Sequence, residues 1–150
     1  MNDNTLWNVF REEAGLIDLL PSDAGEYSDD LLDVLGRFPQ GWLPMIDCGP
    51  GWYRIIADTN RKMRRLAPDY VIHQIKEKFG GLRYYWGAGE NQLDPTLLQI
   101  MTDIELNAER LSKLRCDKCG GFASTRLDRS SNWFYTKCLE CQPHREFEDA

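Results

Sequence analysis

The stretch Tyr70-Val-Ile-His-Gln-Ile-Lys-Glu-Lys-Phe79, followed by Gly80-Gly81 and Leu82-Arg-Tyr-Tyr-Trp86, contains two runs of strand-forming residues. Because two glycines between such runs are typical of a two-residue turn, the stretch predicts an antiparallel β-hairpin. With both glycines in the turn, Phe79 lies opposite Leu82. Lys78 then lies opposite Arg83. We expect this hairpin to form the centre of the fold.

Strand alternation gives the predicted hairpin one apolar and one basic face. The apolar face carries Ile75, Glu77, Phe79, Leu82, Tyr84 and Trp86, and the other face carries Lys76, Lys78, Arg83 and Tyr85. Lys78 directly opposite Arg83 is a repulsive cross-strand pair. Two explanations stay open: an anionic partner binds this face, or carboxylates elsewhere in the chain neutralise the pair.

Two Cys-x-x-Cys pairs follow the hairpin: Cys116-Asp117-Lys118-Cys119 and Cys138-Leu139-Glu140-Cys141, separated by 18 residues. Two intervening residues let both sulfurs of a pair reach one ion, and four thiolates complete a tetrahedral Zn²⁺ shell. The spacing therefore predicts a structural zinc ribbon, with residues 122–127 and 133–137 as its strands. A redox Cys-x-x-Cys or two disulfides are the alternatives, although a redox site needs only one pair.

Four helices are expected besides these strands. Apolar residues at helical spacing predict helices over residues 5–20 and 28–35, with Ser28 as N-cap, and over residues 49–67. Asp94-Pro95 begins another, with an acidic N-cap and proline at the first helical position. The predicted fold class is α+β: about four helices around a small antiparallel β-hairpin or sheet, with a C-terminal zinc ribbon.

The predicted organisation has two parts. Residues 1–114 form an α+β core that includes an acidic helical N-terminal segment, residues 1–36, and residues 115–144 form a zinc-ribbon unit docked on that core. The net charge of −6 is unevenly spread, because residues 1–50 carry ten acidic and two basic side chains. The acidic segment is either a solvated face or a site for a basic partner.

The chain has no apolar run near the roughly 18 residues that a membrane span requires. Its N-terminus, Met1-Asn2-Asp3-Asn4, lacks a basic or apolar signal region. These features predict a cytoplasmic protein without a membrane partner. Reduced thiols in that compartment favour zinc over disulfides.

The densest basic cluster is Arg61-Lys62-Met63-Arg64-Arg65, on the helix over residues 49–67. It is either a solvated helix face or a contact for phosphate or carboxylate. Joined with the hairpin, it would form one basic surface edged by Trp52, suited to nucleic-acid backbone contacts and base stacking. The candidate partner-binding residues are Arg61, Arg64, Arg65, Lys76, Lys78, Arg83 and Tyr85.

Catalytic signals are weak. Cys48 precedes Gly-Pro-Gly at the start of a predicted helix, but the only histidines available as a base are His73 and His144. No nucleotide-binding fingerprint, Ser-His-Asp elbow or His-Glu-x-x-His motif is present. The sequence therefore predicts neither a catalytic site nor a small-molecule substrate, and the role of Cys48 stays open.

The run Lys76-Glu77-Lys78-Phe79-Gly80-Gly81-Leu82-Arg83-Tyr84-Tyr85 resembles a motif in a group of small hypothetical proteins from bacteria and their phages. Those proteins also have a Cys-Gly-x-Gly-Trp element upstream, matched by Cys48-Gly49-Pro50-Gly51-Trp52, and paired Cys-x-x-Cys motifs at the C-terminus. The resemblance covers roughly residues 40–141. It implies a common architecture and a mobile-element setting, but no reaction.

The functional hypothesis is a non-enzymatic, zinc-stabilised binding protein, encoded by a phage or mobile element, that inhibits or assists a host protein. A protein partner is favoured over nucleic acid because the chain is acidic overall. The alternative is a nucleic-acid-binding accessory protein that uses the basic helix over residues 54–65 and the hairpin face over residues 76–85. The sequence leaves the partner and the oligomeric state undetermined.

Overall fold

The computed structural model describes residues 15–90, 92–142 and 147–149. Most of the helix predicted over residues 5–20 lies outside these ranges, as do residues 1–14 of the acidic segment. The described α-helices are α2 (Leu16–Leu19), α3 (Ser28–Leu35), α4 (Tyr53–Leu66) and α5 (Pro95–Ser112). The strands are β1 (Ile46–Asp47), β2 (Val71–Lys78), β3 (Gly81–Gly87), β4 (Thr125–Asp128), β5 (Trp133–Thr136) and β6 (Phe147–Asp149). This mixture of helices and small sheets confirms the α+β class.

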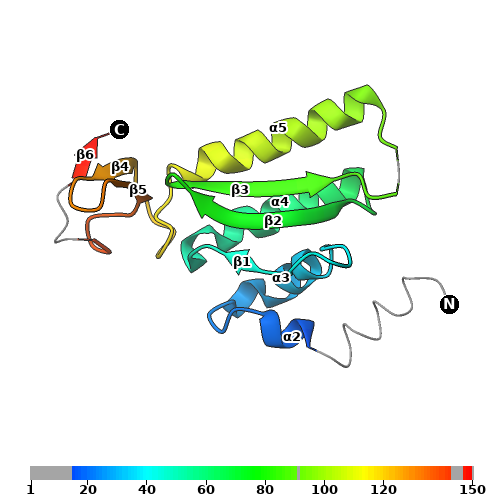
Figure 1. The fold of residues 1–150 in the computed structure, drawn as a ribbon, viewed down its shortest axis with the longest axis horizontal. Coiled ribbons are helices and arrows are strands. Elements are labelled where there is room, and N and C mark those ends of the chain that lie inside the picture. Colours follow the sequence, from blue (N-terminus) through cyan, green and yellow to red (C-terminus); the bar gives the residue numbers. More distant parts are fainter. Residues whose placement is uncertain (1–14, 91, 143–146, 150) are drawn as a thin grey trace.

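The larger sheet has the order β1-β2-β3. β1 pairs with β2 in parallel through Ile46 and Ile75, and α4 connects the two strands, so they form a βαβ unit. β2 and β3 form the predicted antiparallel hairpin. Figure 1 shows this sheet in front of α4, with α5 alongside β3.

The predicted hairpin register is wrong, because the two-residue turn lies one residue earlier in the sequence than predicted. Lys78 pairs with Gly81 and Lys76 pairs with Arg83, so the turn residues are Phe79 and Gly80. Both have positive φ, 53° and 79°, as a type I′ turn requires. Because the pairing moves by two residues, the side chains that remain in the strands keep their predicted faces. Phe79, predicted on the apolar face, lies in the turn and is 50% exposed. The repulsive pair is therefore Lys76 with Arg83.

Contacts with the cysteine-containing segment explain why phenylalanine occupies a left-handed turn position. The Phe79 ring stacks on Trp133 of β5, with ring centroids 6.0 Å apart. The Thr136 hydroxyl donates to the Gly80 carbonyl, while the Gly80 N–H donates to the Glu77 carboxylate at 2.7 Å. These tertiary contacts offset the cost of positive φ at a residue with a side chain.

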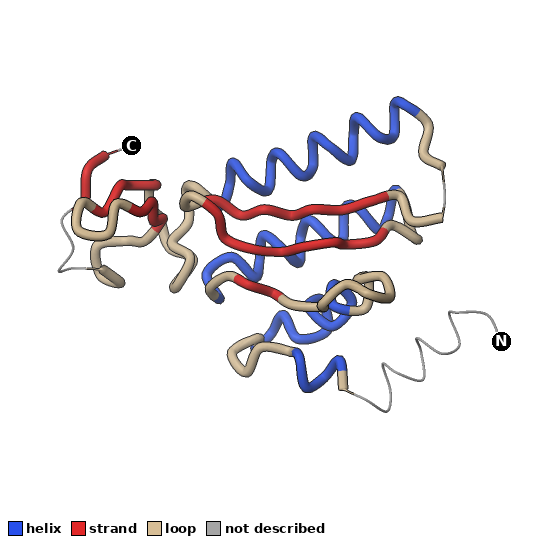
Figure 2. Tube along the Cα trace, in the orientation of Figure 1, coloured by secondary structure: helices blue, strands red, loops and turns tan. Residues whose placement is uncertain are grey.

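The hydrophobic core lies between the sheet and the helices. Side chains of β2 and β3 on one face pack against α3, α4 and α5 (Figure 2). Its fully buried members include Leu31, Trp52, Ile56, Met63, Ile72, Ile75 and Met101. α5 also covers the outer edge of β3, because the Ser112 hydroxyl accepts from the Leu82 N–H at 2.8 Å. None of the described helices packs on the opposite face of the sheet (Figure 1).

The helix boundaries follow the sequence signals, with two corrections. Asp94 caps α5 as predicted, accepting from the Leu97 N–H at 2.8 Å. Ser28 is the first residue of α3 and not its N-cap. The helix predicted from Gly49 begins as a 3-10 turn, Pro50–Trp52, and Leu66 at its end is 39% exposed rather than inward.

A chain of polar side chains crosses the core. The Tyr70 hydroxyl lies 2.7 Å from the Tyr84 hydroxyl and donates to the Asn60 side-chain oxygen. Asn60 in turn donates to the Asp33 carboxylate at 2.6 Å. Burial raises the pKa of both tyrosines, which keeps the phenols protonated. Both tyrosine hydroxyls of this network therefore have a hydrogen-bond partner.

We expect Tyr70→Phe to lower the free energy of unfolding by about 1–3 kcal/mol, because it leaves the Asn60 oxygen buried without a donor. Urea denaturation measures this effect. Tyr85→Phe is the matched control: Tyr85 is 39% exposed, and its change should stay within about 0.5 kcal/mol. Equal effects of the two substitutions would contradict the assignment.

Candidate metal centre

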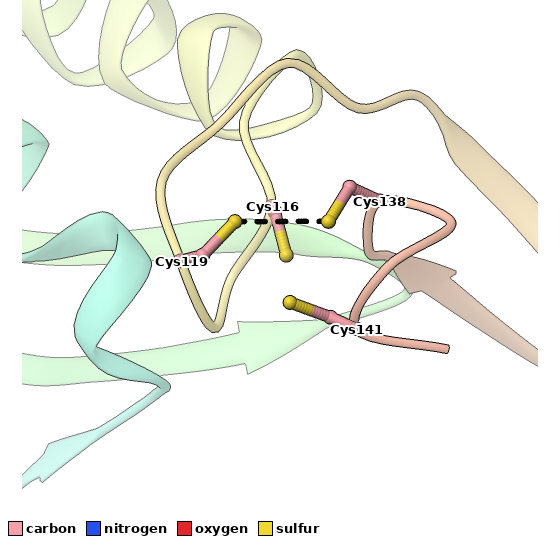
Figure 3. A group of neighbouring side chains, drawn as sticks. All are labelled: Cys116, Cys119, Cys138 and Cys141. Atoms are coloured by element: carbon pink, nitrogen blue, oxygen red, sulfur yellow. Dashed lines mark hydrogen bonds between the residues drawn. The ribbon is translucent and has the colours of Figure 1, made fainter. Parts of the chain in front are cut away.

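Four cysteine sulfurs converge at the end of α5 (Figure 3). Cys116 and Cys119 follow that helix, and Cys138 and Cys141 follow β5, so the metal-binding residues predicted from spacing do come together. All four sulfurs lie within 4.8 Å of one another. Cys116 is buried, Cys138 and Cys141 are half-buried, and Cys119 is exposed.

The spacing of the sulfurs fits a shared ion better than disulfides. A tetrahedral thiolate site with metal–sulfur bonds near 2.3 Å has sulfurs about 3.8 Å apart. The sulfurs of Cys119 and Cys138 are 3.7 Å apart, whereas a disulfide requires about 2.05 Å. All described cysteines are free thiols. The cluster could therefore hold a metal ion, and all four donors are soft sulfur atoms.

The environment of Cys116 favours its thiolate, the form that binds metal. Burial opposes its ionisation, but backbone N–H groups of Cys119, Cys138 and Lys118 surround the sulfur and lower its pKa to about 7. The Gly121 N–H also points at the Cys119 sulfur, 3.4 Å away. The two cysteine loops, residues 116–121 and 138–142, are called knuckles below. Their backbone N–H groups point at the sulfurs of Cys116 and Cys119, whereas the contact with the Cys138 thiol raises the pKa of Cys141.

Local backbone bonds shape the two knuckles. The Cys116 N–H donates to the Gly121 carbonyl at 2.8 Å, and the Gly120 N–H donates back to the Cys116 carbonyl at 2.9 Å. Gly120 has φ of 78°, so glycine is required at this reversal. The second knuckle is closed by the Gln142 N–H, which donates to the Cys138 carbonyl at 3.1 Å.

The strands predicted between the cysteine pairs are confirmed, with different ends. β4 and β5 pair antiparallel, from Thr125 with Thr136 to Asp128 with Trp133. β6 adds a third strand beside β4, which the sequence did not indicate. The aromatic contact of Trp133 is with Phe79 at the hairpin turn.

The first cysteine knuckle is bonded directly to the start of α4. The Gly51 N–H donates to the Asp117 carbonyl at 2.8 Å, and the Trp52 indole donates to the Arg115 carbonyl at 2.8 Å. The Asp117 N–H donates to the Thr136 carbonyl at 2.9 Å, so the knuckle also joins β5. The Gly-Pro-Gly-Trp element thus holds the metal cluster against the core. Sequence reasoning read it only as a helix start, although its paired glycines were a signal of close backbone approach.

Cys48 lies outside the cluster. Burial raises the pKa of its thiol, and nearby carboxylates, Asp117 first, raise it further. The helix start that follows Cys48 therefore does not lower the pKa of its thiol, since desolvation and acidic neighbours outweigh it. His73 packs its ring against Trp42 at a centroid distance of 4.6 Å. His144 lies outside the described residues.

The predicted basic surface is divided between two places. Arg61, Arg64 and Arg65 line a hollow with Arg37 and Pro68 at the end of α4, and no hairpin residue lines it. The hairpin residues Lys76, Lys78, Arg83 and Tyr85 lie on the sheet face turned away from the core, as the alternation of buried and exposed positions shows. Trp52 cannot edge either place, because its side chain is fully buried.

Arg83 is the hairpin residue whose charge is neutralised. Its guanidinium pairs with the Glu109 carboxylate of α5, which also accepts Lys113 at 3.4 Å. This contact bears out the explanation that carboxylates elsewhere relieve the repulsive cross-strand pair. Lys76 and Lys78 have no ion pair with any residue that the structure describes.

Comparisons of the chain with protein-family models, curated proteins and solved structures return no match. The resemblance to the group of bacterial and phage proteins therefore stays a prediction. Within residues 15–90, 92–142 and 147–149, no helix is both long and apolar enough to cross a membrane. The fold and the cysteine cluster define a small α+β protein with four cysteines placed so that they could hold a metal ion.

Proposed function

We propose that this chain is a zinc-stabilised binding protein without catalytic activity. A shell of four thiolates favours zinc among the common protein metals, because soft sulfur ligands in tetrahedral array suit it. Such a shell is closed, so the ion would serve structure only. In that role it would fix the contacts of the cysteine knuckles with Gly51, Trp52 and the hairpin turn.

The observation that carries the binding role is the face of the sheet β1-β2-β3 on which none of the described helices packs, and we call it the open face. It carries Gln74, Lys76, Lys78, Arg83 and Tyr85, with Gln74 exposed and Tyr85 39% exposed. Lys76 and Lys78 form no ion pair with a described residue and lie beside an aromatic ring, an arrangement that suits an acidic partner surface.

Apolar side chains beside the open face favour a protein partner. Trp42, Leu43 and Met45 are 51%, 70% and 45% exposed. They line a hollow of about 230 Å³ together with Gln74 of the open face. Exposed tryptophan and methionine are enriched at protein interfaces. The partner that we propose is a host protein of acidic surface: the lysines of the open face favour the acidic surface, and the mobile-element setting that the resemblance implies favours a host protein.

A nucleic acid is the second candidate, favoured by one specific arrangement. Phe79 stacks on Trp133, and the Lys78 ammonium lies 5.6 Å from the centre of the Phe79 ring. Phe79 and Trp133 are 50% and 44% exposed. Aromatic rings flanked by a cation are the elements that bind single-stranded nucleic acid by stacking and backbone contact.

Charge reversal on the open face tests the proposal. We expect Lys76→Glu with Lys78→Glu to weaken partner binding at least about tenfold, since like charges then face each other. Affinity capture from cells of the native source, with the double variant alongside wild type, measures the loss. Anisotropy with single-stranded RNA and DNA at low salt tests the second candidate.

The control is Arg110→Glu, on an exposed position of α5 where the guanidinium contacts only Asn107 among the described residues. A specific partner is retained by wild type and by this control, and lost by the open-face variant. Retention by all three proteins, or binding of neither protein nor nucleic acid, would refute the open face as the binding site.

A further inference from the structure

Four arginines line a surface hollow of about 440 Å³ at the end of α4: Arg37, Arg61, Arg64 and Arg65, with Pro68. Three of them come from α4 and the fourth follows α3. No carboxylate is among the described residues that line the hollow. Like charges gathered around one concavity repel each other unless counter-charges or a ligand offset them. The number of carboxylates that pair with these arginines therefore determines whether a ligand is needed to offset their repulsion.

Arg37 is held rigidly at the wall of the hollow. Its Nη1 donates to the backbone carbonyls of Pro68 at 2.9 Å and Tyr70 at 3.1 Å, and its Nε donates to Asp33 at 3.1 Å. Its guanidinium also lies over the Tyr70 ring, 4.5 Å from the centroid. The position of this charge is therefore fixed before any ligand arrives, which reduces the entropy lost on binding.

Asp33 is shared among several donors. The oxygen that accepts from Arg37 also accepts from Asn60 at 2.6 Å, and it lies 3.5 Å from Arg64. These hydrogen bonds and charges lower the pKa of Asp33, although burial opposes the shift. One carboxylate charge thus serves both Arg37 and Arg64.

The remaining two arginines differ. Arg61 makes a two-point contact with Asp30, at 2.9 and 2.5 Å, and its charge is matched. Arg65 is exposed and forms no ion pair with a described residue. Among the described residues, the only carboxylate that forms ion pairs with Arg37, Arg64 and Arg65 is Asp33, so these three arginines keep an excess of two positive charges.

We propose that this hollow binds a phosphomonoester group. Its dianion matches the excess of two charges, whereas a carboxylate ligand supplies one. Arg64 and Arg65 can present their planar N–H forks to phosphate oxygens, the geometry in which arginine exceeds lysine. Arg37 stands behind them as a fixed charge. The site is separate from the open face and from the cysteine cluster.

The group can be carried by a small phosphate ester or by a phosphorylated side chain, because both present the same dianion. Titration calorimetry on the full chain at low salt tests the proposal with three probes. They are inorganic phosphate, adenosine 5′-monophosphate, and a serine-phosphorylated peptide beside its unphosphorylated twin. We expect saturable binding at one site, with at least one ester binding more tightly than inorganic phosphate.

Substitutions locate the site. Arg64→Gln and Arg65→Gln should each weaken binding about tenfold, since each removes a charged donor. Arg64→Lys keeps the charge but not the fork, so its loss should be smaller. Arg110→Gln removes the same charge from the exposed face of α5 and should leave the affinity unchanged. Arg64 and Arg65 are exposed, and unchanged circular dichroism and metal content would establish that the variants fold.

The tighter ester identifies the source, and binding of the phosphopeptide but not its twin identifies a phosphorylated side chain. Three results would overturn the proposal. They are no saturable binding of any probe up to about 10 mM, binding of inorganic phosphate alone, and equal weakening by Arg110→Gln. None of these results bears on zinc content or on the open face.

Discussion

Replacing Cys116 by serine is expected to abolish metal binding and to lower the melting temperature of the chain by more than about 10 °C. Cys116 is the buried ligand of the cluster, and a serine hydroxyl does not replace a thiolate in a zinc shell. Structural zinc contributes about 10–16 kcal/mol of apparent binding free energy in small domains at neutral pH. If Cys116→Ser removes only part of this free energy, the chain is still destabilised more than by most single substitutions.

The loss of ordered structure in Cys116→Ser should extend beyond the cysteine cluster. The cysteine-containing segment is hydrogen-bonded to the start of α4 and to the hairpin turn. Without the metal, the knuckle carbonyls that accept hydrogen bonds from Gly51 and Trp52 are no longer held in a fixed position. We therefore expect the near-ultraviolet circular dichroism of the core tryptophan to change as well. Chelation of the wild-type protein should reproduce the same spectrum and melting temperature.

Element analysis of freshly purified protein provides the direct measurement. Wild type should carry about one zinc per chain and Cys116→Ser nearly none. Cys48→Ser is the matched control, because Cys48 is a thiol outside the cluster, and it should keep the zinc. Wild type without metal, or a Cys116→Ser protein that keeps both zinc and melting temperature, would refute the assignment.

The hairpin shows how far sequence patterns reach. Period-two alternation identified both strands and both faces correctly, because alternation depends only on neighbouring residues. The turn was misplaced because two glycines were given the positive-φ positions. Phe79 takes one of them instead, supported by Trp133 and Thr136, which lie more than fifty residues further along the chain. A pattern of neighbouring residues does not reveal contacts with residues this far away in the sequence.

The cysteine cluster was predictable because metal ligands are chemically distinctive and their spacing is short. Its attachment to the core was not, because that attachment is made by backbone atoms. Gly49 and Gly51 approach the backbone of residues 116–120. The paired glycines indicate a close backbone approach, but they do not identify the segment that approaches. β1 was missed for a related reason, since two residues show no periodicity.

The arginine hollow was half predictable. The cluster at residues 61–65 stands out in the sequence, but Arg37 lies far upstream and reaches the hollow through the contact of α3 with α4. Asp30 and Asp33 belong to the acidic segment for which the sequence predicts either a solvated face or a site for a basic partner. In the structure they pair with Arg61 and Arg37 of the same chain. Part of the acidic charge in residues 1–50 is therefore neutralised by arginines of the same chain.

Gly51→Ala is expected to lower the free energy of unfolding by about 2–5 kcal/mol while leaving the zinc ligands intact. A methyl group at Gly51 would overlap the Cys116 carbonyl oxygen and lie 2.6 Å from the Gly120 nitrogen and 2.7 Å from the Asp117 carbonyl carbon. All three are backbone atoms of the metal knuckle, so they cannot turn aside as a side chain can. The knuckle must instead move away from α4, which breaks the hydrogen bonds from Gly51 and Trp52.

Gly81→Ala is the control that separates this clash from a general effect of adding a methyl group. A Cβ at Gly81 would lie 2.9 Å from the Lys113 Cε, near the end of a flexible side chain that is 44% exposed. Lys113 can rotate away, so the change should stay below about 1 kcal/mol. Urea denaturation with parallel zinc analysis measures both variants. Equal destabilisation, or a Gly51→Ala protein as stable as wild type, would show that the knuckle and α4 do not need this close approach.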